Sequence, residues 1–232
     1  MRGSCAGAAA PDCAIAGAVN PAQTKNAATH ERSFIMAALY QVPKPSRDNR
    51  RYHSDMPTIR HARFSGDNDD VELCRTLMRE YARFLNDSVG GEHICVESLE
   101  EELAALPGSY AEPAGAVLLA FKSETPAGCV ALKPLRLDQP ASLNERACEM
   151  KRLWVRPTQQ GTGLGRQLAY AIVAVARDRG YTAMYLDTMP HSMPAAFRLY
   201  RSMGFAPVDR YNQNPVLRQS DALEIAFLRR PL

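Results

Sequence analysis

Three glycines occupy alternate positions in the stretch Gln160-Gly161-Thr162-Gly163-Leu164-Gly165-Arg166. Glycine has no Cβ, so such a stretch lets the backbone pass close to a bound group. The stretch follows an apolar, strand-like run from Met150 to Val155 and opens a helix-like run from Leu164 to Arg179. The N–H groups at the start of a helix have no partner within it, and the helix dipole adds positive potential there. The stretch therefore suits a phosphate or a pyrophosphate.

Two common nucleotide-binding motifs fit this stretch poorly. A dinucleotide-binding fold would place G-x-G-x-x-G early in the chain, with an acidic residue about 20 positions later. Here the glycines come late, and strands and helices do not alternate before them. A P-loop requires G-K-[ST], whereas Gly165 is followed by Arg166 and Gln167. The residues thus disfavour an NAD-binding oxidoreductase and exclude a P-loop.

A second pattern lies downstream, where Ala196 to Phe205 reads A-F-R-L-Y-R-S-M-G-F and fits A-x-x-L-Y-x-x-x-G-F. The glycine stretch itself fits Q/R-x-x-G-x-G/A. Together with the strand-like run from Glu149 to Val155 and the long helix, these patterns resemble the GNAT superfamily of acetyl-CoA-dependent N-acetyltransferases. The resemblance covers Thr58 to the C-terminus in element order, and it is sharpest over residues 149–205.

The resemblance implies that acetyl-CoA is a co-substrate. Its pyrophosphate would lie on backbone N–H groups of the glycine stretch, and the Arg166 side chain could add a charged contact. Its pantetheine arm would lie along the preceding strand, where one backbone amide would polarise the thioester carbonyl. That strand and the next would diverge to admit it. The implied cofactor-binding residues are Leu153, Trp154, Val155, Gln160, Gly161, Thr162, Gly163, Leu164, Gly165 and Arg166.

The implied reaction is direct attack of a primary amine on the thioester in a ternary complex. An amine is mostly protonated at neutral pH, so a base must remove its proton. Glu149 lies eleven residues before Gln160, as the catalytic glutamate does in the histone-acetylating branch of the superfamily. The alternative is a structural glutamate paired with Lys151 or Arg152. The resemblance makes Tyr200 the general acid for the departing thiolate, and the alternative is a core tyrosine.

One position departs from the family pattern. Many members carry Asn three residues before the alanine of the second pattern, where it contacts pantetheine, but here that residue is Met193. His191 and Ser192 are alternatives for that contact. By the same resemblance, two loops line the acceptor pocket. One lies between the first two predicted helices, and the other lies near the end of the chain. The pocket residues expected are Asn86, Asp87, 92–97, Tyr211 and Asn214.

Composition limits the remaining classes. The 232 residues include 28 basic and 25 acidic side chains, which is too even to predict nucleic acid or an anionic membrane as a partner. No apolar run approaches the roughly 20 residues of a spanning helix. Six cysteines without a C-x-x-C pair or zinc spacing indicate reduced thiols in a cytoplasmic protein and predict no metal. Cys148, without a histidine to activate it, is expected to be an inert core thiol.

The elements follow from periodicity, capping residues and breakers. They predict an α/β fold of the α+β type, with a mostly antiparallel, six- to seven-stranded sheet flanked by about four helices. The predicted strands are 58–64, 116–121, 129–137, 148–155, 181–187, 205–211 and 221–228. The predicted helices begin after the cap at 66–70, at a capping box at Ser98-Leu99-Glu100-Glu101, at Leu164 and at Pro194.

The chain is expected to divide into a disordered leader, residues 1–56, and a GNAT-like domain, residues 57–232, with Met56 as an alternative start. The acceptor is expected to be a small-molecule amine or a protein amine. An alternative from another class is a sensor or interaction module that binds acyl-CoA without catalysis. The sequence leaves the oligomeric state open, and a homodimer is compatible with the family.

Overall fold

A computed structural model of the chain describes residues 56–66, 69–88, 96–138, 140–212 and 224–232. The predicted leader, apart from Met56, lies outside these residues and stays a prediction. The strands are β1 (Thr58–His61), β2 (Ala116–Lys122), β3 (Thr125–Pro134), β4 (Ala147–Val155), β5 (Ala183–Thr188), β6 (Ala206–Pro207) and β7 (Ala226–Pro231). The helices are α2 (Val71–Ser88), α3 (Val96–Ala104), η2 (Gly108–Tyr110), η3 (Pro157–Gln159), α4 (Leu164–Asp178) and α5 (Pro194–Ser202).

The predicted fold class and element order are confirmed. The described strands form a seven-stranded sheet in the order β1-β2-β3-β4-β5-β7-β6. Neighbouring strands are antiparallel except β4 and β5, which are parallel. Four α-helices flank this sheet in the described part of the chain.

Several element boundaries differ from the prediction: β1 ends at His61 rather than at 64, and β3 and β5 are shifted by one to four residues. Helix α3 begins at Val96, so Ser98 lies inside the helix and the predicted capping box is wrong, as short motifs often are. The strand predicted at 205–211 is only Ala206–Pro207, although the N–H of Val208 still donates to the carbonyl oxygen of Phe227 in β7 at 3.0 Å. The last strand, β7, runs later than predicted, to Pro231.

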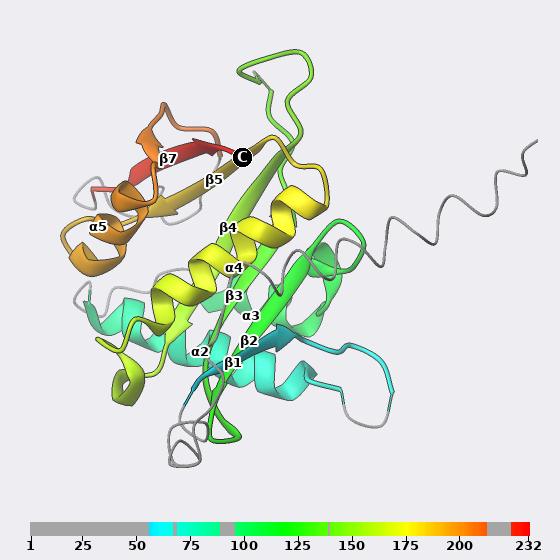
Figure 1. The fold of residues 1–232 in the computed structure, drawn as a ribbon, viewed down its shortest axis with the longest axis vertical. Helices are drawn as coiled ribbons and strands as arrows, with labels where there is room; N and C mark the ends of the chain where they lie inside the picture. Colours follow the sequence, from blue (N-terminus) through cyan, green and yellow to red (C-terminus); the bar gives the residue numbers. More distant parts are fainter. Residues whose placement is uncertain (1–55, 67–68, 89–95, 139, 213–223) are drawn as a thin grey trace, which may run out of the picture. The chain divides into compact units, whose positions relative to one another are not determined.

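Each face of the sheet is covered by its own helices. Helices α4 and α5 pack on one face, and α2 and α3 pack on the other, as Figure 1 shows for α4 and α2. Helix α2 has one apolar face, with Leu77 and Leu85 buried. Helix α4 buries Leu168 and Ile172 on the opposite face. The side chains of the strands between these layers therefore face either α4 or α2.

Strand β4 contains a bulge at Arg152. Ala131 of β3 pairs with Lys151, whereas Cys129 pairs with Trp154, so β4 has one more residue than β3 over this interval. Arg152 has a φ of 56°, a left-handed conformation that residues other than glycine seldom adopt. An extra residue in one strand breaks the alternation of side chains.

The bulge decides which side chains reach the candidate site. Lys151 and Arg152 follow each other in sequence, yet both make their contacts on the α2 and α3 side of the sheet. Leu153 packs into the core beneath α4, and Trp154 is buried in the core beneath α2. The side chain of Trp154, one of the expected cofactor-binding residues, is therefore part of the core.

Candidate active site

The glycine stretch has the backbone geometry that makes glycine necessary. Gly161 has a φ of 77° and Gly163 a φ of 87°, where an L side chain is strained. A Cβ at either position would meet no described atom within 4 Å. Gly163 is the N-cap residue of α4, and no side chain caps the helix there. The space in front of this helix end is therefore not filled by side chains of the described residues.

Backbone N–H groups are available at the same place. The N–H of Gln167 donates to the carbonyl oxygen of Gly163 at 3.1 Å, which starts the ladder of the 15-residue helix. The N–H groups of Leu164, Gly165 and Arg166 precede this bond, and the first turn of a helix leaves such groups without an intrahelical acceptor. The side chain of Arg166 is exposed. This arrangement fits the phosphate-binding role that the sequence predicts.

The polar side chains of the stretch stabilise the loop itself. Gln160 donates through Nε2 to the carbonyl oxygen of Val155 at 2.9 Å, and Thr162 donates through Oγ1 to that of Gln159 at 2.7 Å. These bonds fold the loop back on the end of β4. Gln160 and Thr162 can thus offer a ligand their backbone groups while their side chains hold the loop.

Strands β4 and β5 diverge next to this loop, as the family resemblance implied. Their pairing covers Ala147–Glu149 of β4 and ends at the pair of Glu149 with Tyr185. Strand β4 continues to Val155 and β5 to Thr188 without further pairing between them. The facing edges of the two strands beyond Glu149 are therefore not bonded to each other.

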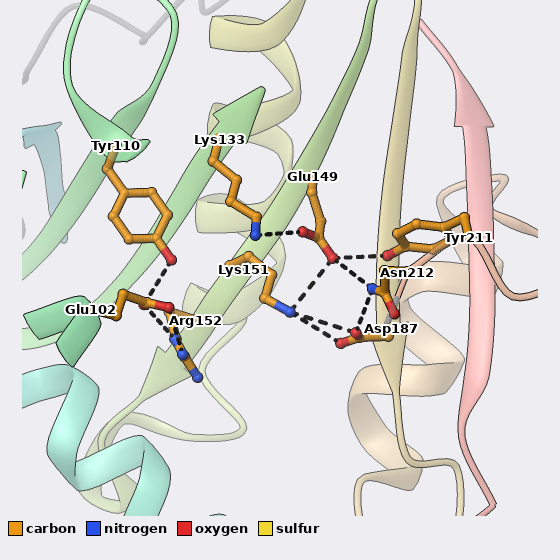
Figure 2. A network of polar contacts seen from close by, with 9 residues as sticks. All are labelled: Glu102, Tyr110, Lys133, Glu149, Lys151, Arg152, Asp187, Tyr211 and Asn212. Atoms are coloured by element: carbon orange, nitrogen blue, oxygen red, sulfur yellow. Dashed lines mark hydrogen bonds and ion pairs between the residues drawn. The ribbon is translucent and has the colours of Figure 1, made fainter. Parts of the chain in front are cut away.

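Glu149 lies at the point where the strands diverge, and it is 1% exposed. Its Oε1 accepts hydrogen bonds from Tyr211 at 3.0 Å and Asn212 at 3.2 Å, and lies 3.5 Å from the Lys151 Nζ (Figure 2). Its Oε2 lies 3.1 Å from the Lys133 Nζ. Burial of a carboxylate is costly unless it is paired and hydrogen-bonded, and these donors meet that requirement.

Lys151 joins Glu149 to a second carboxylate, which the sequence analysis missed. Its Nζ lies 3.4 Å from Asp187 Oδ1, and Asn212 donates to Asp187 Oδ2 at 3.1 Å. Burial alone would lower the pKa of Lys151, but Asp187 and Glu149 raise it above its ordinary value. The only sequence signal for Asp187 was an acidic residue near the end of an apolar strand.

Arg152 does not pair with Glu149, so this part of the structural alternative is wrong. Its guanidinium instead forms a bidentate ion pair with Glu102 of α3. The bulge separates the two cations, since Lys151 reaches towards β5 while Arg152 reaches towards α3 (Figure 2).

Tyr211 reaches Glu149 from the segment after β6. Its ring makes edge contacts with Tyr185, at 4.9 Å between centroids, and with Phe227, at 5.5 Å. Burial and then the charges of Glu149 and Asp187 raise the pKa of the Tyr211 hydroxyl well above its ordinary value. Of the expected pocket residues, Tyr211 therefore lies beside Glu149. Residues 92–95 and Asn214 lie outside the described part of the chain.

Tyr200 is a core tyrosine whose hydroxyl lies within electrostatic reach of Asp187 on β5. It is 7% exposed, and its ring packs on Phe205 with 5.9 Å between centroids. Burial raises the pKa of its hydroxyl, and Tyr81 and Asp187 lie close enough to raise it further. Tyr200 belongs to α5, whereas Tyr81 belongs to α2 on the other face of the sheet. Its hydroxyl is thus protonated at neutral pH, as a proton donor must be.

Thr188 is a further candidate that sequence reasoning missed. Its hydroxyl, on the last residue of β5, is 3% exposed and has no hydrogen-bond partner among the described residues. Buried hydroxyls usually have a partner.

His191, an expected alternative at the position of the missing Asn, instead pairs with Glu224 at 2.9 Å on the surface. Met193 is the N-cap residue of α5.

The remaining candidates are structural. Cys148 is buried, and burial followed by the charge of Glu149 raises the pKa of its thiol to about 12, which agrees with an inert core thiol. The cysteines of the described residues, Cys74, Cys129 and Cys148, are free thiols.

None of the described helices is long and apolar enough to cross a bilayer.

Comparisons with known proteins identify the family. Residues 74–205 match the acetyltransferase (GNAT) family. An uncharacterised N-acetyltransferase of Schizosaccharomyces pombe is 34% identical over 148 residues, which are 63% of this chain and 83% of the relative. The fold matches a GNAT-family acetyltransferase from Staphylococcus aureus Mu50, with a TM-score of 0.56 and 17% identity over 76% of this chain and 99% of that one.

A PaiA N-acetyltransferase from Thermoplasma acidophilum, solved in complex with coenzyme A, has a TM-score of 0.53 and 16% identity, over 76% of this chain and 99% of that one. Its likeness concerns the fold, while the matched family spans both the glycine stretch and the pattern that contains Tyr200. The chain belongs to the GNAT family of acetyltransferases and is an acetyl-CoA-dependent N-acetyltransferase.

Proposed function

We propose that the protein transfers the acetyl group of acetyl-CoA directly to a primary amine in a ternary complex. One observation carries this proposal: β4 and β5 stop pairing at Glu149, and beyond that point Lys151 and Asp187 pair through their side chains, with the Tyr200 hydroxyl within electrostatic reach of Asp187. A buried carboxylate and a protonated phenol therefore lie on the two sides of one opening in the sheet. The acceptor is a small-molecule amine or a protein amine.

The residues present fit coenzyme A. The backbone of Gly161 to Arg166 would hold the pyrophosphate, because the positive φ of Gly161 and Gly163 leaves open space before α4. The backbone of Leu153, Trp154 and Val155 would flank the pantetheine arm, since this edge of β4 is not paired with β5. A protein of similar fold from Thermoplasma acidophilum was solved in complex with coenzyme A, which supports coenzyme A as the kind of ligand. Acetyl-CoA, when bound, supplies the thioester carbonyl.

We propose that the unpartnered hydroxyl of Thr188 contacts the pantetheine arm. Thr188 ends β5 on the stretch that no longer pairs with β4. A buried hydroxyl without a partner is costly, and an amide of the arm would satisfy it. Thr188 would then make the pantetheine contact that asparagine makes in many family members at the position occupied here by Met193.

Glu149 is the proposed base. Its Oε1 accepts from Tyr211 and Asn212, whereas its Oε2 contacts the Lys133 Nζ. A carboxylate oxygen has two lone pairs, so Oε2 can take the proton of the amine, directly or through one water. The bonds to Oε1 fix the direction in which the carboxylate faces.

Tyr200 is the proposed acid. Its hydroxyl keeps its proton at neutral pH because burial raises its pKa. The packing of its ring on Phe205 fixes the hydroxyl in place, so that it can transfer a proton to the sulfur as the thiolate departs.

Release of free thiol from acetyl-CoA across a panel of amines tests the proposal. The panel holds amino acids, polyamines, aminoglycosides, and peptides with free N-termini or lysines. We expect release that depends on one class of amine. A protein that binds acetyl-CoA in calorimetry and releases no thiol with any amine would instead be the non-catalytic acyl-CoA-binding module.

A further inference from the structure

The bulge of β4 is attached to α3 by a partly buried group of three side chains, Glu102, Tyr110 and Arg152. The Arg152 guanidinium donates to Glu102 Oε1 at 3.0 Å and to Oε2 at 2.9 Å. The Tyr110 hydroxyl donates to the same Oε1 at 2.8 Å. Figure 2 shows these three residues beside, and separate from, the contacts of Glu149.

The contacts of this group are strong ones. Bidentate pairs between arginine and carboxylate add geometric specificity to their energy. Burial would raise the pKa of Glu102, but the hydrogen bonds and charge of Arg152 lower it below its ordinary value. Tyr110 is 1% exposed. Glu102 therefore stays ionised and fixes the guanidinium in one direction.

The backbone of Arg152 needs such support. A non-glycine residue at a φ of 56° is unfavourable and persists only when its surroundings impose the conformation. The side chain of Arg152 is the part of the bulge that Glu102 holds. If the bulge relaxed to a regular strand, the side chains after it would change face. Trp154 would then leave the core beneath α2, and the backbone amides of Leu153 and Trp154 would turn.

We propose that Glu102, supported by Tyr110, is a positioning residue that holds the β4 bulge through Arg152 and thereby aims the backbone amide of Leu153, on the edge of β4 that faces away from β3, at the thioester. This inference rests on the proposed function. It assigns α3 a role in catalysis although α3 itself does not contact the proposed cofactor site. A substitution that shifts a transition-state hydrogen-bond donor by about 1 Å can lower the rate about 100-fold.

The chain offers a matched control on the same helix. Glu100, two residues before Glu102, forms a bidentate pair with Arg79 of α2, at 2.9 Å and 2.8 Å. This pair is exposed and does not involve β4. Glu100→Gln and Glu102→Gln are thus the same chemical change in two similar ion pairs, and only one of them acts on the bulge.

Glycine at position 152 separates positioning from simple stabilisation. Arg152→Ala removes the guanidinium and keeps a Cβ at a positive φ, whereas Arg152→Gly removes the guanidinium and adopts that φ freely. If the side chain serves to hold the backbone, the glycine variant should keep more activity than the alanine variant. If Arg152 only stabilises the fold, glycine should be no better than alanine.

Trp154 provides a readout that does not depend on turnover. It is the single tryptophan of the chain, and it lies two residues after Arg152, with its ring 5.3 Å from that of Phe84. Its fluorescence therefore reports the state of the bulge. A titration with acetyl-CoA, followed by this fluorescence, measures cofactor binding in each variant.

The experiment compares wild type with the four variants and with the double variant Glu102→Ala/Arg152→Gly, after thermal unfolding has shown that each is folded. We expect Glu102→Gln to lower kcat about 10- to 100-fold, with a small change in KM for the amine and a shifted Trp154 emission. Glu100→Gln should match wild type in kcat and in the Trp154 emission. Arg152→Gly and the double variant should recover most of the kcat and the emission that Arg152→Ala loses.

Two outcomes would overturn the inference. One is equal kcat and emission for Glu102→Gln and Glu100→Gln, and the other is Arg152→Ala performing as well as Arg152→Gly. A wild type without thiol release would instead refute the proposed function. The emission of Trp154 would still decide, in that case, whether Glu102 holds the bulge.

Discussion

Lys151 and Asp187 form an ion pair, with 3.4 Å between Nζ and Oδ1, across two strands that have stopped exchanging backbone hydrogen bonds. The last backbone pair of β4 and β5 lies just before it, at Glu149 and Tyr185. The side chains thus join the strands where the main chains separate. This keeps the two edges at a fixed distance while their backbone groups remain available to a ligand.

We predict that Tyr200→Phe lowers kcat by about 100-fold or more, since a positioned general acid contributes at least that factor. Affinity for acetyl-CoA should change little, because the ring that packs on Phe205 is retained. Thiol release measures kcat, and calorimetry measures affinity. Unchanged turnover in this variant would remove Tyr200 from the mechanism.

We predict that Gly163→Asp abolishes coenzyme A binding, because it places a negative charge where a diphosphate would lie. Gly66→Asp is the matched control, since Gly66 has a φ of 92° and, like Gly163, no described atom within 4 Å of a Cβ. Both variants carry the same backbone strain, so a difference in calorimetric affinity reports the site alone. Normal affinity in Gly163→Asp would contradict the assignment.

We predict that Glu149→Gln lowers kcat at neutral pH by about 100-fold, and that the loss diminishes as pH rises. The amine loses its proton to solvent at high pH and then needs no base. Glutamine keeps the shape of the side chain and can still accept the bond from Tyr211. The full pH dependence of kcat measures this. A loss that is constant across pH would identify Glu149 as a structural residue.

We predict that Thr188→Val weakens acetyl-CoA binding by a few-fold to about 10-fold, since one net hydrogen bond contributes about 1 kcal/mol. Valine has nearly the same shape, and the hydroxyl has no partner among the described residues, so thermal stability should not fall. Thr188→Ser should bind as wild type does. Calorimetry of the three proteins checks this, and equal affinity of valine and serine would exclude the contact.

We predict that Asp70 stabilises the fold in a pH-dependent manner. Its carboxylate accepts from the guanidinium of Arg60 at 2.6 Å and 2.8 Å and from the N–H of Arg63 at 2.8 Å. The hydrogen bond from Arg60, which outweighs burial, lowers the pKa of Asp70 from 3.8 to about 2.

Because the folded-state pKa of Asp70 is lowered, its stabilising effect is complete above pH 3.8 and is lost as pH falls towards 2. The effect should be about 1 to 2 kcal/mol, reduced by the partial exposure of Arg60. Urea unfolding of wild type and Asp70→Asn should therefore differ at pH 7 and converge at low pH. A difference that persists at pH 2 would contradict this account.

The backbone geometry of the glycine stretch could be predicted from the sequence because it is local. Gly161, Gly163 and the start of α4 are consecutive, and glycine conformation and helix geometry place their N–H groups without help from distant residues. The order of the strands followed in the same way from periodicity. The ends of the elements did not, since Ser98 and Pro207 depend on neighbours that periodicity does not reveal.

Glu149 and Tyr200 were predicted from motifs, but their surroundings were not. Lys133, Asp187 and Tyr211 reach Glu149 or Lys151 from separate strands and loops, and no local pattern links them.

The sequence by itself determined the fold family and the glycine stretch that opens α4, because both depend on residues that are close in the chain. Only the tertiary structure decided which charges meet, because strand register and the extra residue at Arg152 set the face of each side chain. A bulge moves every later side chain to the opposite face, and the residue at this bulge pairs with Glu102, which is 50 positions away in the chain.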